Sequence, residues 1–233
     1  MSTVVEKTCG LRPKAELVFA PVYTQLGGAS ALLEDTSEQA IALVGTSFSD
    51  RYQRDAYQVA GAISNGMDAS VDNFSITGAG LVGAMEAFIQ GGALESGRYK
   101  TVIWEAPYTA PLTNVSGLRQ ILGALHRKGD ETLAYQGRIS NDWMPVGFGF
   151  SSDDFRSIRV QTKDLSIGKL ELEFYNSDGH KTRIKLTKSD RVNVDERSDV
   201  WMVSLAAFPI KEVSRFKVKM TDGAKLASIH LVK

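Results

Sequence analysis

Ser47 is the residue of this sequence whose type and position best suit chemistry, because only Thr46 separates it from the apolar run IALVG of residues 41–45. In an open α/β sheet, reactive groups collect where strands end and helices begin. A serine at such a point is a candidate nucleophile, and the amides of the following helix can stabilise an oxyanion. The same position also suits a helix N-cap, with Asp50 favouring the first turn. The spacing alone leaves both interpretations of Ser47 open.

Glycines in the segment TGAG offer further backbone donors. We consider Gly78 and Gly80, together with the Ser47 amide, as candidates for an oxyanion hole, although these glycines suit a strand-to-helix turn equally well. The segment is not a full dinucleotide fingerprint, and no acidic ribose reader follows at the right distance. The three histidines and one cysteine have no metal-ligand spacing. We therefore expect neither a cofactor nor a metal.

None of the three histidines is an evident base for Ser47. Asp178-Gly179-His180 spells Asp-x-His, but Asn-Ser-Asp-Gly between two alternating strands is turn chemistry, which predicts a hairpin loop. His126 is expected on a helix surface, and His230 is expected to point outward from the last strand. The sequence thus offers a nucleophile without a partner to take its proton.

The elements that must position Ser47 belong to two patterns. Up to about residue 128, short apolar runs alternate with helical stretches, as in βα units of a parallel sheet. After residue 128 the apolar period changes to two, which predicts one-sided β structure and a β-sandwich. The fold class predicted is α/β followed by all-β, with domains over 1–128 and 129–233. The expected strands of the first part are 15–23, 41–45 and 101–106, and its helices 48–63, 80–90 and 115–128. The expected strands of the second part are 132–140, 155–162, 169–175, 181–187, 200–207, 215–221 and 226–232.

Composition excludes several classes of function. The 233 residues carry 27 Lys and Arg against 27 Asp and Glu, so the net charge is zero and any anionic partner must meet a local patch. No apolar run approaches the roughly 20 residues of a membrane span, and no secretory signal is recognisable. The single cysteine, Cys9, is either an inert thiol or has a partner upstream of this sequence.

A local basic patch is predicted on the strand 181–187. Lys181, Arg183, Lys185 and Thr187 alternate with apolar residues and so share one face. If the chain turns at Asp178, however, Tyr175, Glu173 and Glu171 lie opposite Lys181, Arg183 and Lys185 and neutralise them as cross-strand ion pairs. Both outcomes remain open. Further candidates for a binding face are Arg191, Arg159, Lys217 and Lys219, with Trp201 and Trp143 as aromatic platforms that are equally suited to the core.

Three segments in this order resemble a known family: GTSFSD after a strand, NFSITGAGLVGAMEAFI over 73–89, and VIWEAP over 102–107, followed by the sandwich. The resemblance is to the SGNH-like alginate O-acetyltransferases of the AlgX and AlgJ group. It implies part of a three-layer acetyltransferase domain joined to a carbohydrate-binding module in the bacterial periplasm. By resemblance, Ser47 is the nucleophile, Tyr108 is an active-site tyrosine, and the partners are alginate or polymannuronate and secretion proteins such as AlgK.

The sequence departs from the family at one point. The resemblance implies an Asp-x-His pair N-terminal to the Gly-x-Ser strand, but the 46 residues before Ser47 contain no histidine. Loss of a relay member costs several orders of magnitude in rate, so we expect a fragment of a longer enzyme that binds rather than catalyses. The alternatives are a noncatalytic polysaccharide-binding or assembly protein, and a carbohydrate esterase of the SGNH type.

Overall fold

The computed structural model describes most of the chain from residue 40 onward. The described residues are Gly10, 40–50, 58–108, 113–163, 165, 168–221, 223 and 225–233. No helix within them is long and apolar enough to cross a membrane. Cys9 and the expected strand 15–23 lie outside the described residues.

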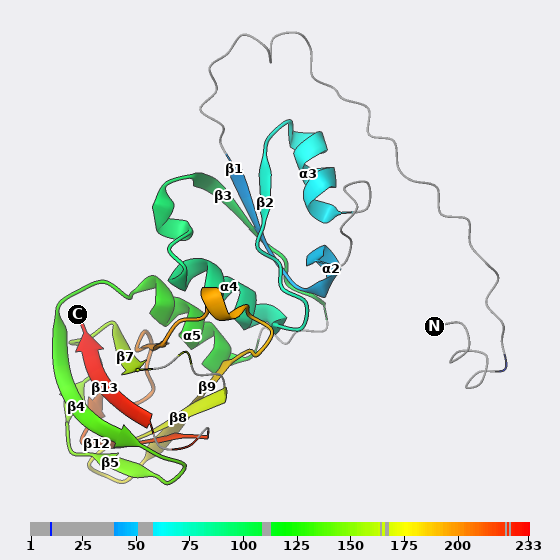
Figure 1. Cartoon of the computed structure of the whole chain (residues 1–233). Coiled ribbons are helices and arrows are strands. Elements are labelled where there is room, and N and C mark those ends of the chain that lie inside the picture. The colour runs from blue at the N-terminus through cyan, green and yellow to red at the C-terminus, as the bar shows by residue number, and fades with distance from the viewer. Residues whose placement is uncertain are drawn as a thin grey trace.

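A three-stranded parallel sheet with the order β2-β1-β3 forms the first part of the described chain (Figure 1). All five residues of the middle strand are buried, as expected for a strand that is covered on both faces. Ser47 follows this strand after Gly45 and Thr46, so the sheet fixes its position. The strands are β1 (Ala40–Val44), β2 (Val71–Asn73) and β3 (Tyr99–Trp104).

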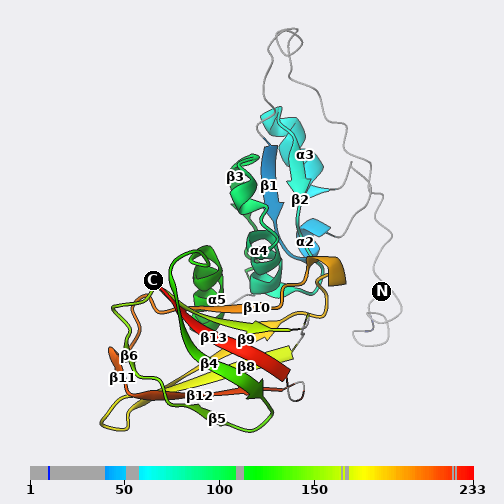
Figure 2. The same ribbon diagram turned by 60° about the vertical axis from the view of Figure 1, so that its left-hand side comes forward.

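Two helices, α4 and α5, lie between this sheet and the rest of the molecule (Figures 1 and 2). Helix α4 packs on β1, and α5 packs on α4 and on the C-terminal strands. Ala42 of the sheet, Phe88 of α4 and Met202 of the C-terminal part share one buried cluster, so the two parts have a common apolar junction. The helices are α2 (Ser47–Asp50), α3 (Val59–Met67), α4 (Gly80–Gln90) and α5 (Val115–Leu125), with 3-10 turns η3 (Leu94–Ser96) and η4 (Val194–Glu196).

The C-terminal part is a sandwich of two antiparallel four-stranded sheets, with orders β10-β7-β13-β4 and β5-β12-β8-β9. A separate pair, β6-β11, adds to it. Inward residues of alternating strands fill the core, where the rings of Phe174 and Phe216 stack with their centres 5.5 Å apart. The strands are β4 (Glu131–Ile139), β5 (Met144–Val146), β6 (Phe150–Ser151), β7 (Ser157–Thr162), β8 (Gly168–Tyr175), β9 (Lys181–Lys188), β10 (Val200–Ser204), β11 (Glu212–Val213), β12 (Arg215–Met220) and β13 (Lys225–Val232).

The predicted fold class, α/β followed by all-β, is confirmed. The helix expected over 48–63 is present as α2 and α3, with 51–57 outside the described residues. Four strands of two or three residues, β2, β5, β6 and β11, were not predicted, because so short a segment shows no period. The domain boundary after residue 128 stays a prediction, since α5 packs on both parts.

Candidate functional site

Ser47 is the first residue of the short helix α2, three residues beyond the end of β1. It is partly exposed, with a buried Val44 and Gly45 before it. Among the described residues, neither its amide nor its hydroxyl has a hydrogen-bond partner. The hydroxyl is therefore accessible rather than enclosed in the core, as a nucleophile must be.

The N-cap of α2 is Thr46, so the interpretation of Ser47 as the cap is wrong by one residue. The Thr46 carbonyl accepts hydrogen bonds from the amides of Ser49 at 3.2 Å and Asp50 at 3.1 Å. The Thr46 hydroxyl accepts a long one, 3.5 Å, from the Phe48 amide. Because Thr46 satisfies these first-turn donors, the Ser47 side chain is not needed for capping.

Thr46 is in turn held by Glu105, the residue after β3. The Thr46 hydroxyl donates to Glu105 Oε1 at 2.6 Å, and the Thr46 amide donates to Glu105 Oε2 at 3.1 Å. Burial acts to raise the pKa of Glu105, but hydrogen bonds from Ser49 and Thr46 outweigh it and hold this pKa below its usual value. The carboxylate is therefore charged at neutral pH.

The segment after β2 lies beside the Ser47 turn. The Ile76 amide donates to the Gly45 carbonyl at 3.1 Å, and the Thr77 amide donates to Asp50 Oδ2 at 2.7 Å. Gly78 and Gly80 follow with φ of +82° and +67°, a region that favours glycine, and neither amide has a partner in the described part of the chain. Their role as oxyanion donors stays a prediction.

Tyr108 lies four residues beyond the end of β3 and is 93% exposed. It stands at the edge of the described range 58–108, and no contact between it and Ser47 is present among the described residues. Its role in the active site stays a prediction.

All three histidines lie in or against the sandwich and have other surroundings than Ser47. His180 closes the predicted hairpin between β8 and β9, where its amide donates to Asn176 Oδ1 at 2.8 Å. His230 points outward from β13 as predicted and lies 3.2 Å from Glu131. His126 follows α5, and its carbonyl accepts from Ser157. The chain's histidines thus supply no base to Ser47 in this structure.

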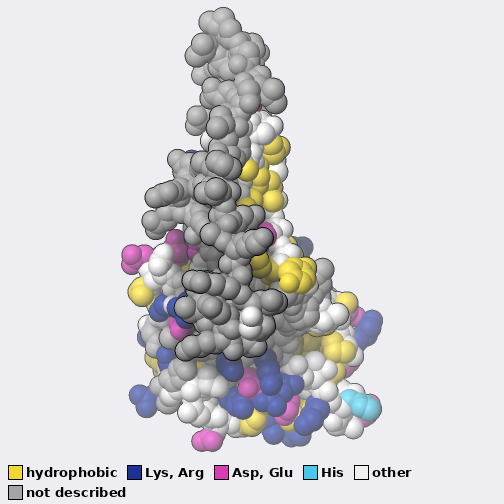
Figure 3. Space-filling model, turned by 90° about the vertical axis from the view of Figure 1, so that its right-hand side faces the viewer, with side chains coloured by type: hydrophobic (Ala, Val, Ile, Leu, Met, Phe, Trp, Pro, Cys, Tyr) yellow, Lys and Arg dark blue, Asp and Glu magenta, His cyan; other side chains and the backbone are white. Residues whose placement is uncertain are grey.

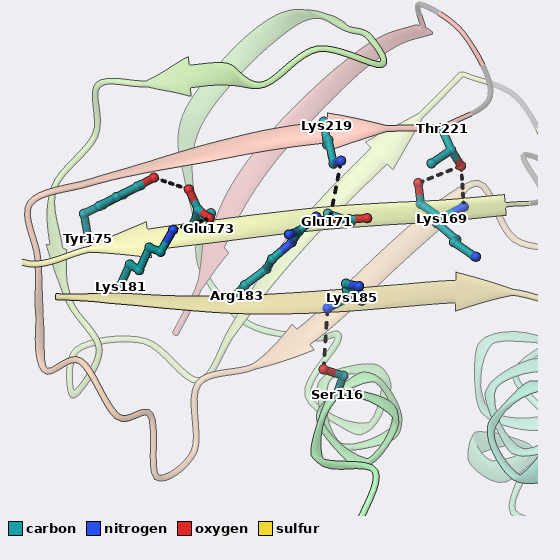
Figure 4. A network of polar contacts seen from close by, with 10 residues as sticks. All are labelled: Ser116, Lys169, Glu171, Glu173, Tyr175, Lys181, Arg183, Lys185, Lys219 and Thr221. Atoms are coloured by element: carbon teal, nitrogen blue, oxygen red, sulfur yellow. Dashed lines mark hydrogen bonds and ion pairs between the residues drawn. The ribbon is translucent and has the colours of Figure 1, made fainter. Parts of the chain in front are cut away.

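The hairpin of β8 and β9 has the predicted register, with Tyr175 opposite Lys181, Glu173 opposite Arg183 and Glu171 opposite Lys185. The ion pairs run diagonally instead: Lys181 pairs with Glu173 at 3.6 Å, and Arg183 pairs with Glu171 (Figure 4). Lys185 has no ion pair among the described residues. The glutamates neutralise part of the strand, as the alternative interpretation expected.

The neighbouring strand β12 restores the positive charge of this sheet. Lys219 lies 3.7 Å from Glu171, and Lys217 lies over the Tyr175 ring at 5.3 Å. Glu171 and Glu173 are only 7% and 8% exposed, so the cations cover the carboxylates. Seven cations and two carboxylates form a surface that we call the basic face. Lys and Arg side chains gather in the lower part of the molecule in Figure 3. The cations of the basic face are Lys169, Lys181, Arg183, Lys185, Arg215, Lys217 and Lys219.

Trp143, just before β5, provides an aromatic ring on the basic face. The guanidinium of Arg183 lies 5.1 Å and the ammonium of Lys219 4.9 Å from the ring centre. Trp143, Lys217 and Lys219 were candidates from the sequence, but their common surface was not predicted, because the order of strands in a sheet could not be derived from the sequence.

Comparison with known proteins finds one family model, one curated relative and one solved structure that this chain resembles. Residues 2–108 match the family model described as "SGNH hydrolase-like domain, acetyltransferase AlgX". The alginate biosynthesis protein AlgX of Pseudomonas putida is 26% identical over an alignment of 209 residues, and the match covers 84% of this chain. The solved structure of AlgX from Pseudomonas aeruginosa superposes with a TM-score of 0.67 at 20% identity over the whole chain. The chain is AlgX-like.

The match to AlgX is partial in length. The chain spans 43% of the Pseudomonas putida protein and 57% of the solved Pseudomonas aeruginosa chain. The family match ends at residue 108, so it contains Ser47 and Glu105 but not the basic face.

Two candidate binding residues, Trp201 and Arg159, have other surroundings than expected, whereas Thr187 has the expected exposure. Trp201 is 0% exposed in β10, so its prediction as a sugar platform is wrong; Lys188 Nζ lies 4.8 Å from its ring centre inside the molecule. The Thr187 side chain is exposed on β9. Arg159 lies in the other sheet and pairs with Glu131 at 2.6 Å, away from the basic face.

Arg191 follows β9 and is an exposed cation between the two parts of the AlgX-like chain. Its side chain lies against Gly78, where an added Cβ would stand 3.1 Å from Arg191 Cγ. It also lies 3.7 Å from Asp190. Arg191 therefore lies against the segment beside Ser47, and its role in polymer binding stays a prediction.

A buried polar cluster at the junction of α4, α5 and β9 was missed from the sequence. Gln120, 1% exposed, donates to Glu86 Oε2 at 2.6 Å and to the Thr187 carbonyl at 3.1 Å, and accepts from the Thr187 amide at 3.2 Å. Burial raises the pKa of Glu86 to about 7 and lowers that of nearby Lys188 to about 8. The one sequence feature that indicates this cluster is Glu86, a glutamate within the apolar face of the helix 80–90.

Proposed function

We propose that this chain is part of an alginate O-acetyltransferase that carries acetyl on Ser47 and holds the polymer with its sandwich. The observation that carries the proposal is the basic face, where seven cations and two aromatic rings surround two covered carboxylates. A chain of uronates presents one carboxylate per sugar and apolar ring faces, which Lys, Arg and aromatic side chains suit. Polymannuronate is the expected acceptor.

The acyl transfer would run in two steps at Ser47. The Ser47 oxygen attacks the donor's carbonyl carbon and loses its proton to a base, and the donor's leaving group departs with a proton. A mannuronate hydroxyl then attacks the acetyl-serine, which returns the serine hydroxyl and yields the acetylated polymer. No histidine of this chain lies beside Ser47, so the proposal requires a base from an Asp-x-His pair beyond these residues. Tyr108, Gly78 and Gly80 remain candidates for contacts with the reacting group.

The setting of this reaction is part of the same proposal. AlgX of Pseudomonas putida is an alginate biosynthesis protein, and alginate is a polyanion. We place the protein in the periplasm, with envelope secretion proteins such as AlgK as partners. Fractionation of cells that produce the protein, followed by co-purification with AlgK, tests this placement.

Polymer binding is tested by calorimetry with polymannuronate at two salt concentrations. We expect Lys185→Ala to weaken binding several-fold at low salt and to reduce the salt dependence, because it removes an unpaired cation. Arg138→Ala is the matched control, since Arg138 is an exposed cation on β4 of the other sheet. Equal effects of the two substitutions would refute the basic face as the binding site.

The acyl role of Ser47 is tested by mass spectrometry after incubation with 4-nitrophenyl acetate, with imidazole added as a substitute base. We expect acetyl to accumulate on Ser47 faster than on any other serine, and the other serines in the same digest serve as internal controls. Addition of polymannuronate should remove the label and acetylate the polymer. Release of free acetate instead would indicate a carbohydrate esterase.

A second candidate is favoured by one observation, the absence of a histidine beside Ser47 in the described part of the chain. In that case the protein is a noncatalytic polysaccharide-binding or assembly protein. It would bind polymannuronate through the basic face with normal affinity while Ser47 takes up acetyl no faster than other exposed serines.

A further inference from the structure

The backbone position of Glu105 is fixed by the sheet, independently of the contacts of its side chain. The Glu105 amide donates to the Val44 carbonyl at 2.9 Å and continues the pairing of β3 with β1 by one residue. Because the two strands are parallel, Glu105 stands at the same edge of the sheet as Gly45 and Thr46. Its side chain is therefore directed by a rigid element towards the turn that leads to Ser47.

Each carboxylate oxygen of Glu105 accepts a hydrogen bond from Thr46 of that turn. Oε1 accepts from the Thr46 hydroxyl and Oε2 accepts from the Thr46 amide, at 2.6 and 3.1 Å. Gly45 leaves room for this contact, since an added Cβ would stand 2.5 Å from Glu105 Oε2 and 2.8 Å from Ser75 Oγ. The turn and the carboxylate thus fit each other closely.

The hydrogen bonds of this turn occupy every backbone donor but one between Thr46 and Asp50 in the described residues. The Thr46 amide donates to Glu105, and the Phe48 amide donates to the Thr46 hydroxyl. The amides of Ser49 and Asp50 donate to the Thr46 carbonyl. The Ser47 amide alone among these five donors has no partner in the described residues. A donor beside the nucleophile is what an oxyanion in an acyl-transfer reaction needs.

Glu105 is poorly suited to take a proton itself. Its two oxygens already accept hydrogen bonds, and these bonds hold its pKa below the ordinary value of a glutamate. A general base near neutral pH needs the opposite shift. The arrangement suits a group that stays charged and holds its neighbour in place.

We infer that Glu105 is a positioning residue: its carboxylate grips Thr46 by amide and hydroxyl and so presents the Ser47 hydroxyl together with a free Ser47 amide. This inference rests on the proposed acyl transfer at Ser47. It assigns to the glutamate of WEAP a role in the geometry of the nucleophile rather than in proton transfer.

The test uses the full chain with Glu105→Ala and Glu105→Gln, and Glu212→Ala as control. Glu212 is exposed on β11 and forms no ion pair among the described residues. In amide NMR spectra, we expect Glu105→Ala to shift the Thr46 and Ser47 signals and to speed exchange of the Thr46 amide at least about tenfold, with the sandwich signals unchanged. Glu105→Gln keeps an acceptor and should restore part of both effects.

Acetyl uptake by Ser47 is measured on the same variants with 4-nitrophenyl acetate and imidazole. We expect a decrease of about ten- to a hundredfold for Glu105→Ala, because a misplaced nucleophile loses its alignment. Polymannuronate affinity should not change. The pH dependence of the residual rate should keep the wild-type shape, whereas loss of its acidic limb in Glu105→Gln would make Glu105 a base and overturn the inference.

Two outcomes separate this inference from the proposed function. Unchanged Thr46 and Ser47 signals, or an unchanged Ser47 acetylation rate in Glu105→Ala, would overturn the positioning role while leaving the proposed function intact. If the unaltered chain takes no acetyl on Ser47, the acyl-transfer function fails, and the NMR signals still decide whether Glu105 holds the Ser47 turn.

Discussion

Gln120 of α5 donates a 2.6 Å hydrogen bond to the buried carboxyl group of Glu86 on α4. The same side chain holds the Thr187 backbone of β9 by two further bonds. A carboxyl group of the α/β part is thereby joined to the strand that carries Lys181, Arg183 and Lys185. The charge of Glu86 consequently matters for the junction between the two parts.

Glu86→Gln should change how stability depends on pH. Burial raises the folded-state pKa of Glu86 from 4.5 to about 7, so the folded chain holds this proton more tightly than the unfolded chain. The resulting stabilisation is fully present below pH 4.5 and is lost as pH rises through 7, a change on the order of 3 kcal/mol. In urea unfolding, the free energy of unfolding of the variant should rise relative to that of the wild type as pH increases over this range. A difference independent of pH would contradict the assignment.

Trp143→Ala should weaken polymannuronate binding about tenfold without unfolding the sandwich. The ring carries Arg183 and Lys219 at 5.1 and 4.9 Å, and each cation–π contact is worth about 0.5–1 kcal/mol at an exposed site. Trp104→Ala is a matched control, because Trp104 is 37% exposed on β3 of the parallel sheet, outside the sandwich. Binding is measured by calorimetry and folding by circular dichroism.

Glu171→Gln should strengthen binding to polymannuronate. Glu171 pairs with Arg183 and lies 3.7 Å from Lys219, so its removal frees two cations of the basic face for the polymer. The gain should be a few-fold at low salt and should diminish as salt rises above about 0.15 M. Affinity that falls instead would mean that Glu171 orients the cations for binding.

Gly45→Ala should destabilise the sheet and the Ser47 turn together. An added Cβ would meet Glu105 Oε2 at 2.5 Å and Ser75 Oγ at 2.8 Å, and overpacking of this kind costs about 1–3 kcal/mol. Gly66→Ala is the control, since Gly66 lies within α3 with nothing within 4 Å of its added Cβ. There, the substitution should stabilise by about 0.5–1 kcal/mol. Chemical denaturation measures both.

The parts of the fold that could be predicted from sequence are those governed by local pattern. The buried run of β1 and the alternation of β8 and β9 around Asn-Ser-Asp-Gly identified the strands and even the register of their hairpin. Trp201 was misplaced because β10 is covered on both faces: Trp201 lies in the sandwich core and Met202 beneath the helices, both 0% exposed. With both faces apolar, the period of two disappears.

The candidate site was predictable in its nucleophile but not in its support. Ser47 is marked by a local feature, the end of an apolar run. The hydrogen bonds that hold Thr46 come from Glu105, 59 residues away. They depend on the pairing of β1 with β3, which could not be predicted from the local sequence pattern. Likewise, Lys219 and Trp143 joined the basic face only through the strand order β5-β12-β8-β9.

The outer edge of β9 is closed by a helix rather than left open. Ser116 and Gln120 of α5 bond to the backbone of Lys185 and Thr187, where another strand would otherwise add. A second molecule is therefore denied the usual template for growing a continuous ribbon from this sheet. If the protein binds along a polyanion as proposed, the closed edge of β9 would oppose its association into fibres at high local concentration.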